Sequence, residues 1–373
     1  VRVYARIRPL SKKEIDNNEE IKCTFDDEIT LSLSTVYGGT EESTRPFQFD
    51  SVFGPDTTQV DIFEECSGMM ESALDGYNAC VFAYGQTGAG KTWTMSGNDD
   101  VKANWGLTRR FVEYLFKEVD DKRAKNQATI KVYCEFLEIY CDELRDLFYI
   151  MDNARDKKKL ADMPKLEPGM NAEGRVVVKG IQRKEATNVD EMLAWFNAAN
   201  KGRVVHATEM NAESSRSHSV FTIYTENYNH TTKKTFKGKL NIIDLAGSER
   251  TGKSKVTGQQ LEEANAINNS LMALGMCVSS LTEVDKNGKP KFVNYRNNIL
   301  TRVMQDSLGG TSKTLMFVNM SPAGSNSQET KSSLEYAKNM KKITNTTNKS
   351  EDSAIVNSLK DEIKKLKMEL AAS

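Results

Sequence analysis

The chain has 373 residues, of which 38% are hydrophobic and 28% are charged. This composition predicts a folded core and excludes disorder along the whole chain. Lys and Arg number 51 against 52 Asp and Glu. The net charge of −1 argues against a general nucleic-acid-binding protein, although a local basic surface could still meet an acidic partner.

No membrane segment is expected, because no apolar run approaches the roughly 20 residues that a spanning helix needs. No signal peptide precedes the strand-like residues 1–10, and this abrupt start suggests a piece of a longer protein. The six cysteines form no CxxC pair and most lie in apolar surroundings, which is typical of buried thiols in a cytosolic protein.

Strands and helices are expected to alternate along the chain. Apolar or alternating segments predict strands at residues 1–9, 21–25, 29–35, 46–55, 78–85, 219–228, 237–247 and 313–322. Helical spacing predicts helices at residues 58–76, 106–121, 188–203, 260–284, 299–310 and 327–343. Residues 129–148 read as a long strand passing into a helical turn, and residues 149–172 as a surface loop. The alternation predicts an α/β layered domain with a central mixed sheet.

The tail differs from this domain. Residues 345–353 are polar and predict an extended or flexible segment. In residues 354–373 apolar side chains recur at heptad spacing over about two heptads, a run too short to decide between three interpretations. These are the start of a coiled coil, an amphipathic helix packing on the core, and a basic helix suited to a calmodulin-like groove.

The sequence GQTGAGKT at residues 85–92 carries the clearest chemical signal. It fits the phosphate-loop pattern G-x-x-x-x-G-K-[ST] and follows an apolar strand, as the mechanism requires. The glycines let backbone N–H groups approach phosphates closely, Lys91 is expected to reach the β- and γ-phosphates, and Thr92 to bind Mg²⁺. The alternative is a glycine-rich turn that binds nothing.

Two further stretches fit the same site. In DLAGSE (residues 244–249) Asp244 ends a predicted strand, where a carboxylate typically binds Mg²⁺ through water, and Gly247 can offer its N–H to a γ-phosphate. In NAESSRSH (residues 211–218) the hydroxyls of Ser214 and Ser215 can contact the γ-phosphate, the attacking water and Mg²⁺. Alone, the second stretch would read as a serine-rich turn.

In this order the three stretches resemble the phosphate loop and the two switches of the kinesin motor family. Further similar stretches are RIRP (6–9), FQFDSVF (47–53), INNSLMALG (267–275), YRNNILTRVMQDSLGG (295–310) and KTLMFVNMSP (313–322). The resemblance covers about residues 1–345. It implies a P-loop NTPase-type three-layer domain in residues 1–344, with a mixed, mostly parallel sheet between helices. Residues 345–353 would be a neck-linker-like segment, and residues 354–373 a neck.

The resemblance also implies roles for individual residues. Arg216 and Glu249 would form a salt bridge that closes the pocket and lines a water path, with Ser214 and Gly247 completing the catalytic group. Mg²⁺ would be held by Thr92, Ser215 and, through water, Asp244. ATP or ADP would contact Arg8, Pro9, Gly85, Gln86, Thr87, Gly88, Ala89, Gly90, Lys91, Thr92, Trp93, Asn211 and Ser215.

A microtubule is the partner that the resemblance implies. The predicted helix 260–284 would dock on it, and the basic residues expected at the acidic surface are Lys253, Lys255, Lys291, Arg296 and Arg302. Lys157, Lys158 and Lys159 could equally be solvated charges. The family usually has lysine at the positions of Asn269 and Ile299, which predicts weaker or altered binding to the microtubule.

A microtubule-stimulated ATPase motor, cytoplasmic and bound to the cytoskeleton, is therefore the leading hypothesis. Competing hypotheses are an ATPase that remodels filament ends, a microtubule anchor with little turnover, and a P-loop NTPase with no filament. The sequence looks most like kinesins with a C-terminal motor, and among them the calmodulin-binding plant type. A self-dimer would form through sequence outside this piece, and direction of movement depends on the neck.

Overall fold

A mixed β-sheet forms the centre of this computed structural model, which describes residues 1–206, 216–249, 259–284, 286 and 288–352. In spatial order its main strands are β11 (Lys184–Ala186), β7 (Ala128–Tyr140), β12 (His218–Asn229), β13 (Lys234–Asp244), β6 (Asn78–Tyr84), β14 (Ser312–Met320), β1 (Arg2–Ile7) and β5 (Ser51–Phe53). The strands from β13 to β5 pair in parallel, and the pairs from β11 to β13 are antiparallel. The predicted central mixed sheet is confirmed.

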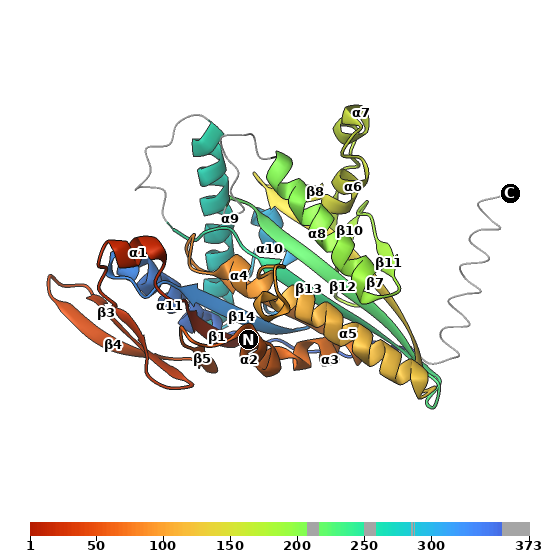
Figure 1. Cartoon of the computed structure of the whole chain (residues 1–373), viewed down its shortest axis with the longest axis horizontal. Coiled ribbons are helices and arrows are strands. Elements are labelled where there is room, and N and C mark those ends of the chain that lie inside the picture. Colours follow the sequence, from red (N-terminus) through yellow and green to blue (C-terminus); the bar gives the residue numbers. More distant parts are fainter. Residues whose placement is uncertain (207–215, 250–258, 285, 287, 353–373) are drawn as a thin grey trace.

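Helices cover both faces of this sheet (Figure 1). One face carries α2 (Gln59–Cys66), α3 (Gly68–Leu74), α5 (Leu107–Ala124) and α8 (Val189–His206). The other carries α9 (Gln259–Thr282), α10 (Ile299–Val303) and α11 (Ser327–Met340). Strand β6 shows why the sheet has two cores, since Val81 faces the first layer and Phe82 the second, both fully buried. Among the helices in the described ranges, none is long and apolar enough to cross a membrane.

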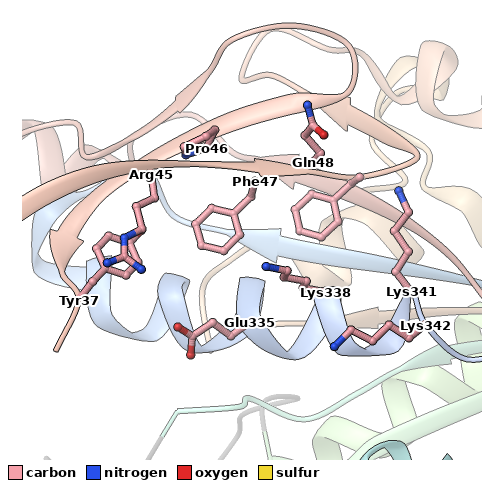
Figure 2. A pocket seen from close by; sticks show the side chains of 10 residues that line it. Tyr37, Arg45, Pro46, Phe47, Gln48, Glu335, Lys338, Lys341 and Lys342 are labelled. Carbon is pink, nitrogen blue, oxygen red and sulfur yellow. The ribbon is translucent and has the colours of Figure 1, made fainter. Parts of the chain in front are cut away.

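A small antiparallel sheet lies beside α11 at one end of the molecule. It consists of β2 (Cys23–Phe25), β3 (Thr30–Val36) and β4 (Glu42–Gln48), and its buried leucines join the core under α11. A cleft of about 710 Å³ separates β4 from the helix. Figure 2 shows Phe47 on β4 pointing toward α11, and the guanidinium of Arg45 lies over the ring of Tyr37, 4.2 Å from its centroid.

Several predicted elements have different bounds in the structure. The helix expected at residues 58–76 is two helices, α2 and α3, that meet at Ser67, whose hydroxyl bonds the carbonyl of Glu64. A serine hydroxyl that competes for a helical carbonyl, followed by a glycine of low helix propensity, explains the break. The helix expected at residues 299–310 keeps only the short α10.

The stretch 129–148 also differs from a single strand. Cys141 and Asp142 have φ angles of 49° and 59°, and this left-handed turn sends the chain back as β8 (Glu143–Asp146) against β7 before α6 (Leu147–Asp152) begins. The predicted loop 149–172 contains α7 (Lys157–Ala161) and β9 (Glu167–Met170), which pairs with β10 (Val176–Lys179). These short elements could not be predicted from the sequence, because their patterns of apolar residues span only a few residues.

The polar residues after α11 lie along the core. The Asn345 amide donates to the carbonyls of Ser307 and Ser312 at 2.9 and 2.7 Å and accepts from Gly309 N–H at 2.8 Å. Farther on, Ser350 N–H bonds Gly76 O at 2.9 Å, and β15 (Glu351–Asp352) pairs with β13. A Cβ at Gly76 would lie 2.7 Å from Ser350 O, so this approach requires glycine. The predicted helix 354–373 lies outside the described residues.

We predict that replacing Asp306 destabilises the domain strongly. Lys239 on β13 is 2% exposed, and its ammonium group lies 2.6 Å from the Asp306 carboxylate, which is fully buried and also accepts from Val176 N–H. Asp306→Ala would leave the Lys239 charge buried without its partner, and a buried pair broken in this way costs about 3–5 kcal/mol. Urea unfolding measures the change.

The exposed pair Lys291–Glu283 supplies the control. We expect Glu283→Ala to leave the midpoint of urea unfolding almost unchanged, because a solvated ion pair contributes little. An Asp306→Ala chain as stable as the Glu283→Ala chain would contradict the assignment of Lys239–Asp306 as a structural pair.

Candidate functional site

The site lies where β6 and β13 end side by side. Because these strands are parallel, with Asp244 opposite Ala83, the loop after β6 and the segment after β13 begin at the same edge of the sheet. In that loop Gly85, Gly88 and Gly90 have φ angles of 145°, 75° and 99°. A Cβ at Gly85 would lie 2.2 Å from the carbonyl oxygen of Asn319. The glycines of the motif are therefore needed for the path of the backbone.

Lys91 opens the short helix α4 (Lys91–Met95) and is 6% exposed. Its ammonium group donates to the carbonyls of Gly85 and Gln86, each at 2.9 Å. Burial lowers the pKa of Lys91, while the carboxylates of Asp244 and Glu249 favour its charged form. The predicted phosphate-binding lysine is thus held inside its own loop.

The hydroxyl of Thr92 donates to Asp244 Oδ2 at 2.7 Å, so two of the predicted Mg²⁺ ligands meet. Asp244 is 6% exposed, and its other oxygen, Oδ1, is buried with no protein partner. Burial raises the pKa of this carboxyl, and the positive charge of Lys91 opposes the shift. A hydroxyl beside a carboxylate with an unsatisfied oxygen fits Mg²⁺, which prefers few protein ligands plus water and phosphate oxygens. The third predicted ligand, Ser215, lies outside the described residues, as do Ser214 and Asn211.

The segment after Asp244 is bound to the phosphate loop. The carboxylate of Glu249 accepts from the hydroxyl of Thr87 and, at 2.8 Å, from its N–H, and Ser248 N–H donates to Gly85 O at 3.1 Å. A Cβ at Gly247 would lie 2.3 Å from Thr87 Oγ1 and 2.4 Å from Glu249 Oε2. A glycine is required at residue 247 so that these groups can approach one another.

In this structure Arg216 and Glu249 have other partners, and their salt bridge stays a prediction. Arg216 Nη1 lies 2.8 Å from Glu263 Oε2 on α9, and Glu249 is engaged by Thr87. Glu263 is almost fully buried and also accepts from Tyr140 OH at 2.6 Å. This partner could not be predicted from the sequence motifs, because Glu263 lies in α9, beyond the DLAGSE stretch.

His218 is a residue that the sequence reasoning missed. It begins β12, is 2% exposed, and its ring nitrogens lie 3.0 Å from Ala246 N and 2.8 Å from Ser270 Oγ. Burial lowers its pKa to about 3. The only signal in the sequence was its place at the end of NAESSRSH.

The residues predicted to contact adenine lie at the other side of the phosphate loop. Arg8 Nε donates to Gly88 O at 2.6 Å, and its guanidinium bonds both oxygens of Glu14 at 2.6 and 2.7 Å. This pairing lowers the pKa of Glu14 to about 2. Pro9 follows, and Trp93 on α4 is 42% exposed, which leaves its ring available for stacking. Arg8 is thereby fixed against the phosphate loop.

Comparisons with known proteins agree with this geometry. The family model of the kinesin motor domain matches residues 6–343. The chain belongs to the kinesin motor-domain family. A fast kinesin of known structure superimposes with a TM-score of 0.81 at 36% identity, with 93% of each chain covered. The kinesin motor fold, with its sheet between helices, is therefore confirmed.

Curated kinesins from plants and an amoeba are also similar. Kinesin-like protein KIN-14I of Oryza sativa subsp. japonica and KIN-14E of Arabidopsis thaliana are both 39% identical, over 94% of this chain and 26% of their own length. Kinesin-related protein 2 of Dictyostelium discoideum is 39% identical over 90% of this chain and 43% of its own. The chain thus spans less than half the length of these kinesins.

The residues predicted to face a microtubule are only partly available in this kinesin domain. Lys291 and Arg296 are exposed, whereas half-buried Arg302 donates to the carbonyl of Pro168 at 2.6 Å. Lys253 and Lys255 lie outside the described residues. Among the residues where the family usually has lysine, Asn269 is exposed and Ile299 is half-buried against the core.

Uncharged side chains stand out on the same face. Met272 and Met276 on α9 are 62% and 53% exposed, and Phe292 in the following loop is 86% exposed. The three lysines at residues 157–159 are exposed on α7, which projects from the sheet in Figure 1.

We predict that Gly247→Ala lowers the rate of ATP hydrolysis at least tenfold while the domain stays folded. The added methyl group must displace Thr87 or Glu249, and overpacking of this kind typically costs about 1–3 kcal/mol. Steady-state phosphate release and thermal unfolding measure the two effects. Gly39→Ala is the matched control, because a Cβ there meets no atom within 4 Å. Equal rates in the two variants would contradict the requirement for glycine at residue 247.

Proposed function

We propose that this kinesin domain is a microtubule-stimulated ATPase that converts ATP hydrolysis into movement. One observation carries the proposal: Lys91, Thr92, Asp244 and Glu249 converge on one loop, although they come from segments far apart in the sequence. Such a group can hold a triphosphate, position a metal and report whether the terminal phosphate is present.

Binding begins with the phosphate loop. When ATP enters, the ammonium group of Lys91 exchanges its two loop carbonyls for β- and γ-phosphate oxygens, and the N–H groups of Gly88, Ala89 and Gly90 bind the remaining charge. Thr92, Asp244 and Ser215 would hold Mg²⁺, and the bound ion would neutralise the charge that develops on the phosphate. Arg8, Pro9 and Trp93 receive the adenine.

Hydrolysis then depends on positioning. Ser214 and Gly247 orient the attacking water and the γ-phosphate, and Glu249 receives the proton through a short water path. For this step Glu249 leaves Thr87 and Arg216 leaves Glu263, so that the two form the salt bridge of the closed site. One ion pair and the hydrogen bonds between Thr87 and Glu249 are exchanged for a new ion pair, which makes closure responsive to the γ-phosphate.

Movement follows from the attachment of α9 to these segments. Loss of phosphate releases residues 247–249, and α9 shifts on the microtubule while the chain after residue 344 moves as a neck-linker-like output. Lys291 and Arg296 supply charge for the acidic filament, and Met272, Met276 and Phe292 supply apolar contact. Residues 354–373 serve as a neck, coiled-coil start or calmodulin-like binding helix, and the full-length protein dimerises.

The direct test compares ATP turnover with and without microtubules. We expect strong stimulation by microtubules and gliding of filaments over a surface coated with the chain. Stimulation accompanied by filament shortening would favour a remodelling enzyme, and high filament affinity without stimulation would favour an anchor. Turnover that microtubules leave unchanged would contradict the proposal.

We predict that Glu249→Ala binds ATP within about threefold of the parent affinity but hydrolyses it roughly 100-fold or more slowly, because removal of a proton acceptor typically costs that much. A fluorescent ATP analogue measures binding, and a single-turnover assay measures hydrolysis. Glu335→Ala, at an exposed position on α11, is the control. Parent-like hydrolysis in Glu249→Ala would remove Glu249 from the mechanism.

A further inference from the structure

His218 joins three parts of the domain through one buried ring. It lies at the start of β12, directly after the first switch. Its Nδ1 lies 3.0 Å from the backbone N of Ala246, two residues beyond Asp244, and its Nε2 lies 2.8 Å from the hydroxyl of Ser270 on α9. The ring is therefore in direct contact with both the segment that contains Gly247 and the helix proposed to dock on the filament.

The hydrogen bonds around the ring determine where its proton lies. Ala246 N–H can only donate, so Nδ1 must be the acceptor, and the neutral ring carries its proton on Nε2. Nε2–H then donates to Ser270 Oγ, whose own proton goes to the carbonyl of Ile267 at 2.7 Å. Each donor has one acceptor, which makes this chain directional and fixes the orientation of the ring.

A second link joins the residues just before β12 to the face of α9 that contains Ser270. Arg216, two residues before His218, bonds Glu263, and Glu263 lies seven residues before Ser270, which is two helical turns. In the proposed cycle Arg216 must leave Glu263 to reach Glu249. The His218–Ser270 bond does not have to break for this exchange, so it can still join the start of β12 to α9 while the site is closed.

We propose that His218 is a positioning residue that holds α9 against the phosphate-sensing edge of the sheet, and that its bond to Ser270 carries part of the stimulation of turnover by microtubules. This inference rests on the proposed function, because it concerns how the filament-bound helix acts on the site. Ala246 and Ser270 engage both ring nitrogens, so we assign the ring no part in proton transfer. It acts through the backbone of Ala246.

Ser270→Ala is the primary test, because it removes one buried hydroxyl and leaves the ring and Ala246 in place. Loss of one hydrogen bond corresponds to about a fivefold change in rate. We expect the microtubule-stimulated kcat to fall about fivefold while turnover without microtubules stays within twofold. Ser279→Ala on the same helix is the matched control, since that hydroxyl bonds the exposed Glu283 carboxylate within the described part of the chain.

His218→Asn tests the same bond from the other side. The Asn oxygen can occupy the place of Nδ1 and accept from Ala246 N–H, but the side chain is too short to reach Ser270. We expect the same fivefold loss, and no further loss in the His218→Asn/Ser270→Ala double variant, because both changes remove one interaction. Should His218→Asn fail to fold, Ser270→Ala alone decides the outcome.

Two results would overturn the inference. One is parent-like stimulation of Ser270→Ala, and the other is an equal loss of turnover with and without microtubules, which would make the bond only structural. A parent chain that microtubules do not stimulate would overturn the proposed function together with this inference. Unchanged variants of a stimulated parent would overturn this inference alone.

Discussion

The parallel pairing of β6 with β13 is the constraint on which the site depends. It brings the ends of two strands, more than 150 residues apart in the sequence, to one edge, where Thr92 and Asp244 make a hydrogen bond of 2.7 Å. The close packing around Gly85 and Gly247 follows, because neither position has room for a Cβ. A phosphate bound at this edge would contact both segments at once, so its release would remove contacts from both.

The same edge is joined to α9 by the buried side chains of His218, Ser270 and Glu263 and by the half-buried side chain of Arg216. His218 reaches Ser270, and Arg216 reaches Glu263, so residues 216–218 hold the helix at two points on one face. The opposite face of α9 exposes Met272 and Met276. A helix that is tied to the site on one side and free on the other is suited to pass a change in the site to a partner.

Much of the fold and the phosphate loop could be predicted from the sequence, because strands such as β6 are apolar throughout and GQTGAGKT is specific. Asn188, the first residue of the predicted helix 188–203, caps α8 by accepting from Glu191 N–H at 2.9 Å. The partners of Arg216 and His218 were not predictable, since Glu263 and Ser270 belong to a helix whose packing depends on the whole core. The turn at Cys141–Asp142 was missed because it lacks glycine and proline.

In the proposed mechanism a terminal phosphate, sensed by these two segments, changes the affinity with which α9 binds a microtubule. Co-sedimentation with microtubules tests it most directly, at fixed salt, with a non-hydrolysable ATP analogue, with ADP and without nucleotide. We expect the affinity for microtubules to differ at least tenfold between the analogue and ADP, which corresponds to about 1.4 kcal/mol of coupling. Identical affinity in all three conditions would contradict it.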